Sequence, residues 1–284
     1  MFLTINGCQL YVELLGGDDK SKPLIITHHG APGLGSHAEP KASFGSLADE
    51  YRVLVFDARG SGASGDEGPF SHEQWAADID ALRQWVGDEK VIIGGGSYGG
   101  YMSMEYAIRY PQHVMAMVLR DTAPDNSFRA GSDARARGSD RIEITPEMED
   151  LYIRQREGRV RNNEEFKKSW GLILPLYDHN LDMEKVKQRI ENTPYHYATH
   201  NYAFSVNQKN FDLKPQLAKL KVPTLITVGR HDWITPVAAS EKIHELLENS
   251  ELKIFEHSGH SPQVEEADLW RATVRDFLAR HVPR

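Results

Sequence analysis

A serine enclosed by glycines has the surroundings most suggestive of chemistry in this sequence. The segment Gly95-Gly96-Ser97-Tyr98-Gly99 fits the G-x-S-x-G pattern of a nucleophile elbow. A predicted buried strand over residues 90–93 precedes it, and a predicted helix that ends near Tyr110 follows. A strand-to-helix turn this sharp needs small neighbours, and the amides of a helix N-terminus favour developing negative charge. The segment therefore predicts that Ser97 is the nucleophile of an acyl-transfer reaction.

The same glycines permit a second interpretation. Gly94, Gly96 and Gly99 also satisfy G-x-G-x-x-G, the fingerprint of dinucleotide binding, and Asp121 at the end of the next predicted strand would then contact the ribose. That aspartate lies 27 residues beyond Gly94 rather than about 20. The fingerprint also usually follows the first strand of its sheet, whereas several predicted strands precede it here. An NAD(P)-binding oxidoreductase and a merely structural glycine turn remain the alternatives.

A nucleophilic serine needs a base and an orienting acid, which in this kind of fold follow it in the order Ser, Asp or Glu, His. Asp232 and His260 each come directly after a predicted buried strand downstream of Ser97. Parallel strands bring their carboxyl ends to one edge of a sheet, where open α/β sheets place their sites. The order and spacing predict Asp232 as the acid and His260 as the base. Their local rivals are Asp121 for the acid and His257 for the base.

Acyl transfer also needs backbone N–H donors directed at the oxyanion. Tyr98 follows the serine and supplies one such donor, and the loop His29-Gly30-Ala31-Pro32-Gly33 follows an earlier strand and supplies the second through Ala31. Taken alone, this loop could equally be a tight turn that happens to be rich in glycine and proline.

The elements that would position these residues alternate between short apolar strands and helices. Alternation of this kind is typical of a parallel sheet with helices on both faces. The predicted strands lie within residues 2–15, where Asn6-Gly7 suits a tight hairpin, and at 23–27, 52–56, 90–93, 114–119, 222–228 and 252–255. Besides the helix after Ser97, helices are predicted near 36–49, 71–86, 236–248 and 264–280. Residues 125–209 break the rhythm with helical pieces only, which predicts one core (1–124 and 210–284) with an inserted helical cap (125–209).

Composition narrows the class of protein further. The chain has 284 residues, 40% hydrophobic and 26% charged, as in ordinary globular proteins. Lys and Arg number 33 against 41 Asp and Glu, and the net charge of −8 disfavours nucleic acid as a partner. Cys8 is the single cysteine, so no internal disulfide forms. Without a signal-like N-terminus or an apolar run of about 18 residues, we expect a cytoplasmic protein with no membrane partner.

Several segments together resemble the α/β-hydrolase superfamily, and within it the proline-iminopeptidase-like serine hydrolases. The matching segments are HGAPG at 29–33, DARGSGAS at 57–64, GGSYGG at 95–100, KVPTLITVGRHDWITP at 221–236 and SGHSP at 258–262. The resemblance implies an α/β-hydrolase fold with a mostly parallel eight-stranded sheet, helices on both faces and an inserted helical cap. It also implies a Ser97–Asp232–His260 triad that acts on a small molecule or a short peptide without metal or cofactor.

One departure from that family concerns the substrate. Aminopeptidases of the family recognise a free amine with acidic residues, and this sequence has Trp233 and Arg230 at the corresponding positions. A protonated amine in a dry pocket needs a carboxylate partner, which the cap would have to supply; its candidates are Glu164, Glu165, Asp178 and Asp182. Two hypotheses follow: a proline iminopeptidase that releases an N-terminal residue, or an esterase, lactonase or amidase whose substrate has no free amine. An epoxide hydrolase would have aspartate at position 97.

The remaining candidates concern binding. Four aromatic residues are candidates for the wall of the substrate pocket: Trp233, Trp170, Tyr177 and Tyr202. His196 and His200 have the spacing of a helical metal pair but lack the Glu of H-E-x-x-H, which favours a structural role. The arginines of residues 129–161 are matched by acids, which favours a solvated surface. A receptor that keeps the pocket without reactivity is a further non-enzymatic alternative.

Overall fold

Eight strands form the centre of the computed structural model, which describes residues 1–282; residues 283–284 of the predicted core lie outside this range. Their order across the sheet is β1-β2-β4-β3-β5-β6-β7-β8. The first two pairs, β1 with β2 and β2 with β4, are antiparallel, and every other pair is parallel. The strands are β1 (Phe2–Ile5), β2 (Cys8–Leu15), β3 (Leu24–His28), β4 (Arg52–Phe56), β5 (Val91–Gly96), β6 (Val114–Arg120), β7 (Thr224–Gly229) and β8 (Ser250–Phe255). The predicted sheet class is confirmed.

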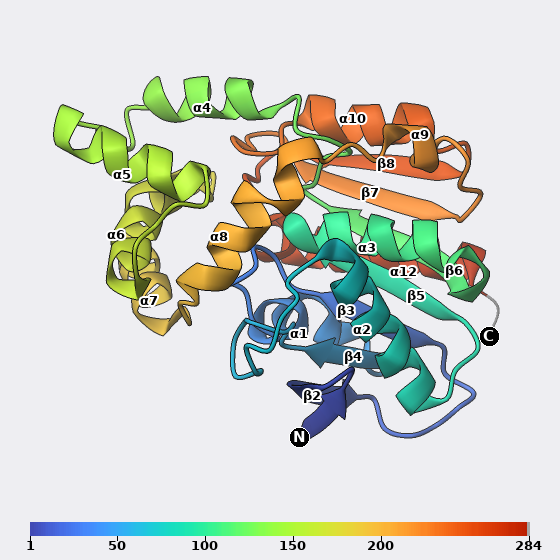
Figure 1. Cartoon of the computed structure of the whole chain (residues 1–284). Coiled ribbons are helices and arrows are strands. Elements are labelled where there is room, and N and C mark those ends of the chain that lie inside the picture. Colours follow the sequence, from blue (N-terminus) through green and yellow to red (C-terminus); the bar gives the residue numbers. More distant parts are fainter. Residues whose placement is uncertain (283–284) are drawn as a thin grey trace.

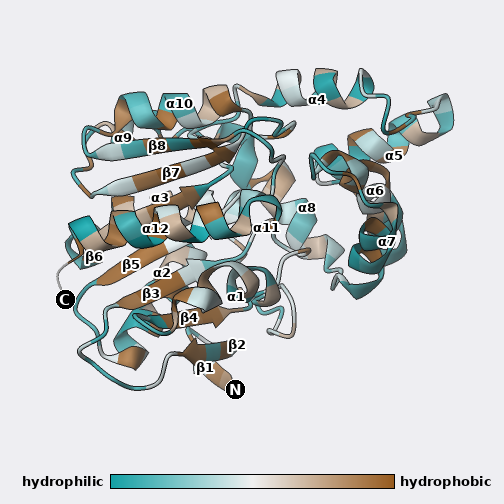
Figure 2. Cartoon of the chain, turned by 180° about the vertical axis from the view of Figure 1, so that it is seen from behind, coloured by the Kyte–Doolittle hydropathy of each residue, from teal (hydrophilic) through white to brown (hydrophobic). Residues whose placement is uncertain are grey.

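The central strands are apolar on both faces, which is why helices cover both (Figure 1). Successive residues point to opposite faces, so Leu54 packs in one core cluster while its neighbours Val53 and Val55 pack in another. The first cluster is covered by α2 (His72–Val86), α3 (Tyr98–Arg109), α9 (Lys214–Leu217) and α10 (Val237–Leu246). The second is covered by α1 (Ala38–Phe44) and α12 (Ala267–His281). Figure 2 shows the strands as mostly hydrophobic and the outer faces of the helices as hydrophilic.

The chain between β6 and β7 contributes helices and no strand of the sheet within residues 1–282. Apart from α9 they are α4 (Arg129–Arg137), α5 (Pro146–Arg156), α6 (Asn163–Ile173), α7 (Met183–Asn192) and α8 (Tyr197–Ser205). They gather beside one end of the sheet (Figure 1), and their apolar side chains form a third cluster that includes Tyr152, Phe166 and Trp170. We call this group of helices, α4 to α8, the cap helices. The exact boundaries of a cap at residues 125 and 209 remain predictions.

Local sequence signals account for several element boundaries. Ser71 accepts a hydrogen bond from the Gln74 amide and begins α2, and Gly87 ends that helix in the left-handed conformation. Asn6 and Gly7 both have positive φ, as the predicted hairpin turn requires. One prediction was wrong in detail: the C-terminal helix expected over 264–280 is interrupted at Glu266, which separates α11 (Pro262–Glu265) from α12. Within residues 1–282, no helix has both the length and the apolar character needed to cross a membrane.

Candidate active site

Ser97 occupies a strained turn between β5 and α3. Its backbone angles are φ 54° and ψ −123°, a region that residues other than glycine occupy only when the surroundings enforce it. The neighbours enforce it here by close packing. A Cβ at Gly95 would lie 2.5 Å from the Gly99 backbone, and one at Gly99 would lie 2.2 Å from the His28 carbonyl oxygen. The small residues of the motif are therefore required by the turn.

These contacts also bear on the dinucleotide interpretation of the glycines. A Cβ at Gly96 would lie 2.0 Å from the Arg120 guanidinium, and one at Gly94 would lie 2.9 Å from the Phe44 ring. Protein atoms already fill the space that a phosphate-binding loop leaves open for its ligand. The packing favours the elbow over a phosphate cradle.

Backbone hydrogen bonds to β6 and the residues after it hold the serine in place. The Ser97 amide donates to the carbonyl oxygens of Arg120 (2.9 Å) and Asp121 (3.1 Å). The Thr122 hydroxyl donates to the Ser97 carbonyl oxygen at 2.9 Å. The strained backbone is thus fixed on both sides of the side chain.

Asp232 and His260 form a buried hydrogen-bonded pair. His260 Nδ1 lies 2.8 Å from Asp232 Oδ2, and both side chains are almost fully buried. The Thr235 hydroxyl donates to Asp232 Oδ2 at 2.7 Å, and the amides of Ile234 and Thr235 donate to Oδ1. Among residues 1–282, nothing hydrogen-bonds the other imidazole nitrogen, His260 Nε2. The arrangement leaves that nitrogen available as a base.

The loop that carries His260 is held by two glutamates at the helix break. Glu265 accepts from the Gly259 amide (2.6 Å), and Glu266 accepts from the His257 amide (3.0 Å) and the Ser258 hydroxyl (2.6 Å). These bonds give a physical reason for the interruption between α11 and α12. His257 itself is exposed and lies outside the buried group.

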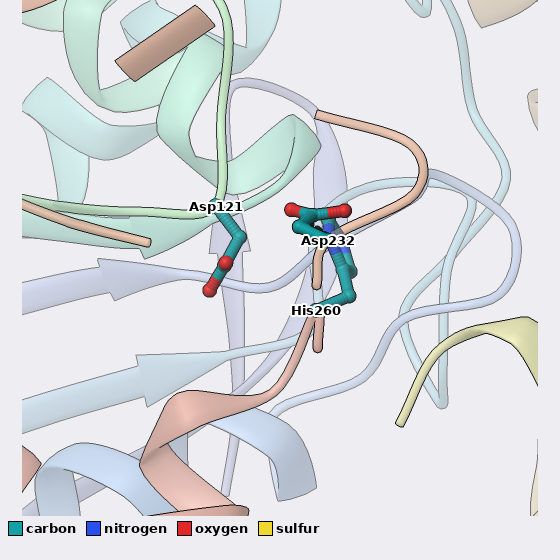
Figure 3. A group of neighbouring side chains, drawn as sticks. All are labelled: Asp121, Asp232 and His260. Carbon is teal, nitrogen blue, oxygen red and sulfur yellow. Dashed lines mark hydrogen bonds and ion pairs between the residues drawn. The ribbon is translucent and has the colours of Figure 1, made fainter. Parts of the chain in front are cut away.

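Asp121, the rival acid, lies beside the pair, and its pKa is shifted in the opposite direction to that of Asp232 (Figure 3). Burial alone would raise the pKa of Asp232, but His260 and the hydrogen bonds outweigh it, so the net pKa is below the ordinary value. Burial and the nearby Asp232 charge raise the pKa of Asp121 well above the ordinary value, although Arg120 Nη1 lies 3.5 Å from its Oδ2. Asp121 Oδ1 accepts from the Gly229 amide at 2.9 Å. Asp232 is therefore the more easily ionised of the two.

Asp121, Asp232 and His260 are also the one group of potential metal ligands found within residues 1–282, with ligand atoms all within 4.8 Å of one another. Figure 3 shows the three side chains converging from the loops after β6, β7 and β8. Asp232 Oδ2 already receives hydrogen bonds from Thr235 and His260. These bonds account for the cluster as an acid–base pair with a second buried carboxyl group beside it.

A cavity of about 60 Å³ opens beside Ser97. Ala31, Ser97 and Tyr98 line it, and so do Tyr177 and Thr235, which both contact His260. Within the described chain, the backbone N–H groups of Ala31 and Tyr98 donate to no other residue. A Cβ at Gly30 would lie 3.8 Å from Ser97 Cβ, so the 29–33 loop lies against the nucleophile. Two unpaired donors thus border the serine, as an oxyanion site requires.

The predicted pocket aromatics divide into two groups. Trp170 and Tyr177 line the cavity, whereas Trp233 and Tyr202 are not among its lining residues. Trp233 is buried against Tyr177, with ring centroids 5.8 Å apart. Tyr202 packs against Phe70 at 6.2 Å. The structure thus brings only two of the four to the cavity.

None of the four cap acids considered as amine ligands lines the cavity. Glu165 is paired with Arg154 and Arg161. Glu164 is exposed, and Asp182 caps α7. Asp178 accepts a hydrogen bond from Arg141 at its backbone oxygen. The carboxylate that does line the cavity is Asp125, and it is already paired with Lys214 and with the Ser127 hydroxyl and amide.

Sequence reasoning missed two arginines at this site. Arg129 and Arg156 both line the cavity, and Arg156 is buried. The matched acids and bases of residues 129–161 predicted a solvated surface instead, and for these two side chains that prediction was wrong. Burial of a single arginine depends on how the cap helices pack, which local composition does not reveal.

His196 and His200, the pair with the spacing of metal ligands, do not belong to the group of potential metal ligands found within residues 1–282. His196 Nε2 contacts the Gly62 carbonyl oxygen, and His200 Nε2 contacts the Gln155 carbonyl oxygen.

Comparisons with known proteins identify the family of the chain. Residues 23–267 match the model of the alpha/beta hydrolase fold family. The chain is 35% identical over 282 residues to the proline iminopeptidase PfmaB of Pestalotiopsis fici, covering 98% of this chain and 99% of the relative. It is 25% identical over 291 residues to a proline iminopeptidase of Saccharolobus solfataricus, covering 96% and 90%.

Solved structures share the fold at lower sequence identity. An enol-lactonase from Burkholderia xenovorans aligns with a TM-score of 0.75 at 21% identity, covering 98% of this chain and 100% of the other. An esterase from Exiguobacterium antarcticum aligns with a TM-score of 0.75 at 23% identity, covering 98% and 99%. These similarities concern the architecture of the chain.

Proposed function

Because the chain belongs to the alpha/beta hydrolase fold family and is a hydrolase, we propose that it is a serine hydrolase that forms an acyl-enzyme on Ser97. The observation that carries the proposal is the buried His260–Asp232 pair at 2.8 Å, with His260 Nε2 free of protein partners. Ser97 and two residues that contact His260 line one cavity. An activated nucleophile of this class consists of a serine, a base and an orienting acid.

The proposed reaction has two acyl-transfer steps. His260 Nε2 accepts the Ser97 hydroxyl proton as Oγ attacks the substrate carbonyl carbon, and the amides of Ala31 and Tyr98 bind the resulting oxyanion. When the tetrahedral intermediate collapses, His260 returns the proton to the leaving oxygen or nitrogen. Water then attacks the acyl-enzyme with the same base, which releases the acid and restores Ser97. Asp232 holds the imidazole tautomer and stabilises its cation throughout.

The charges around the cavity favour a substrate without a free amine. Among the residues that line the cavity, Asp125 is the one with a carboxylate side chain, and its ion pair with Lys214 already neutralises that charge. A protonated amine would therefore face Arg129 and Arg156 without an ionic partner of its own. An ester, lactone or amide with a small acyl group meets no such penalty. A second candidate function is the release of an N-terminal proline. It is favoured by the sequence relatives, which are named proline iminopeptidases.

A substrate panel separates the two candidates. The purified protein is assayed with short-chain acyl esters, a lactone and Pro-β-naphthylamide, with the Ser97→Ala variant as the background control. We expect hydrolysis of an ester or lactone and none of Pro-β-naphthylamide. Hydrolysis of Pro-β-naphthylamide as the better substrate would overturn the preference for amine-free substrates and support the iminopeptidase. Equal activity of the Ser97→Ala variant would overturn the serine hydrolase itself.

A further inference from the structure

The cavity beside Ser97 contains more hydrogen-bond donors than the protein satisfies. Trp170 Nε1 is buried and has no partner within residues 1–282. Two tyrosines on the same cavity, Tyr101 and Tyr177, are also buried, and within residues 1–282 neither hydroxyl is hydrogen-bonded to the protein. Burial raises the pKa of Tyr101 to about 12, so its hydroxyl keeps its proton at neutral pH. Unsatisfied buried donors are costly unless a ligand supplies the acceptors.

Two arginines add positive charge to the same wall. Arg156 donates to Asp133 (2.7 Å) and to the Ser132 hydroxyl (2.8 Å) through two of its three nitrogens. Its third nitrogen, Nη1, has no partner in the described part of the chain. Arg129 donates to the Arg156 carbonyl oxygen, and within that part of the chain it makes no ion pair. Asp133 is paired with Arg156 and Glu157 with Arg159, so both acids that act on Arg129 already have another arginine as partner.

The proximity of the two arginines is itself unfavourable. Burial, together with the positive charge of Arg156, lowers the pKa of Arg129. Both arginines and Tyr101 line the same cavity. An anion bound there would relieve the repulsion and accept the free donors.

We infer that the substrate carries a carboxylate, which Arg129 and Arg156 bind while Ser97 attacks a carbonyl elsewhere in the same molecule. This inference rests on the proposed serine hydrolase and names its substrate class: an ester, lactone or amide whose acyl part ends in a carboxylate. The guanidinium fork matches the two oxygens of a planar carboxylate, and the hydroxyl of Tyr101 and the indole N–H of Trp170 supply further donors. The small cavity restricts the acyl part to a short chain.

Three methyl esters of equal chain length test the charge preference. Monomethyl glutarate is anionic, methyl pentanoate is neutral, and the methyl ester of the matching ω-amino acid is cationic. Hydrolysis is followed by base titration at constant pH, which gives kcat/KM for each. We expect the anionic ester to be preferred over the neutral one by roughly 10- to 100-fold, and the cationic ester to be the poorest. A neutral or cationic ester that is hydrolysed as well as the anionic one would overturn the inference.

Substitutions at Arg129 test whether this arginine causes the preference for the anionic ester. Arg129→Gln should lower the anionic-to-neutral ratio of kcat/KM at least tenfold, Arg129→Lys should retain part of it, and Arg129→Glu should reverse it towards the cationic ester. Arg129 is the better position to change. Arg156→Gln would remove the ion-pair partner of Asp133 and so destabilise the fold as well. An unchanged ratio in Arg129→Gln and Arg129→Glu would contradict the inference.

Two controls separate this inference from the proposed function. Arg159→Gln removes a positive charge from the same segment at an exposed residue paired with Glu157, and it should leave all three rates unchanged. Labelling by an uncharged fluorophosphonate reports on the nucleophile alone. Labelling of Ser97 without an anionic preference would refute the carboxylate site and leave the hydrolase standing. Absence of both labelling and hydrolysis would refute the proposed function, and the inference with it.

Discussion

His260 Nδ1 lies 2.8 Å from Asp232 Oδ2, while Asp121, a second buried carboxyl group beside the pair, accepts a hydrogen bond from the Gly229 amide and not from the imidazole. Its surroundings lower the pKa of Asp232, whereas burial and the neighbouring Asp232 charge raise the pKa of Asp121. Asp232 is therefore the more easily ionised of the two and the better placed to stabilise an imidazolium by its charge. These different environments favour Asp232 over Asp121 as the acid, which is also the preference that the sequence predicts.

Asp232→Asn should reduce kcat by roughly 10³- to 10⁴-fold, because the amide would favour the wrong imidazole tautomer and provide no charge. The measurement is kcat on the best ester of the panel, with circular dichroism to verify folding. Asp121→Asn is the matched control and should cost less than tenfold, because His260 Nδ1 contacts Asp232 and because the raised pKa of Asp121 favours the neutral form that asparagine resembles. A large loss in Asp121→Asn with little loss in Asp232→Asn would reverse the assignment.

Gly95→Ala should destabilise the protein by about 3 kcal/mol, because the added Cβ would lie 2.5 Å from the Gly99 backbone. The free energy of unfolding from urea titration measures this effect. Gly131→Ala in α4 is the matched control: its Cβ would meet only the flexible end of Arg135 at 3.4 Å, and helix propensity should stabilise it by about 0.5–1 kcal/mol. Equal effects in both variants would show that the elbow is not tightly packed.

The protein should lose stability as pH falls below about 6.5, and His28 contributes to the loss. Burial lowers the pKa of His28 from 6.5 to about 3 in the folded state. Between these two values the unfolded chain binds a proton that the folded chain does not, so acid favours unfolding. The contribution of His28 between pH 7 and pH 4.5 is about 2 kcal/mol.

Urea unfolding of His28→Asn at these two pH values tests this prediction. Asparagine retains a donor for the His29 carbonyl oxygen, which His28 Nδ1 contacts at 2.8 Å, but it does not titrate. The variant should lose less stability than the wild type on acidification. Because burial also lowers the pKa of His200, to about 4, part of the acid sensitivity should persist. An identical loss in both proteins would refute the role of His28.

The parts of the site that could be predicted from sequence depend on local pattern and chain order. Ser97 lies in a five-residue motif, and Asp232 and His260 follow apolar strands whose carboxyl ends meet at one edge of the sheet. The helix N-cap at Ser71 and the hairpin at Asn6-Gly7 were predicted for similar reasons. Each signal lies within a few residues of the feature it predicts.

The parts that could not be predicted depend on contacts between distant segments. Arg156 belongs to a stretch with balanced charges, and only the packing of the cap helices turns it towards the cavity. Trp233 follows the acid in sequence, yet its ring packs against Tyr177 instead of lining the cavity. The break at Glu266 likewise depends on bonds to the loop that carries His260. Amphipathic periodicity alone contains no information about these contacts.

Reaction of the protein with a fluorophosphonate, followed by intact-mass measurement and peptide mapping, tests the central claim most directly. The account predicts one adduct per chain, on Ser97, and loss of ester hydrolysis in proportion to labelling. Ser97→Ala should form no adduct and should retain less than roughly one part in 10⁴ of the turnover. An adduct on another residue, or full turnover by the folded Ser97→Ala variant, would contradict the account.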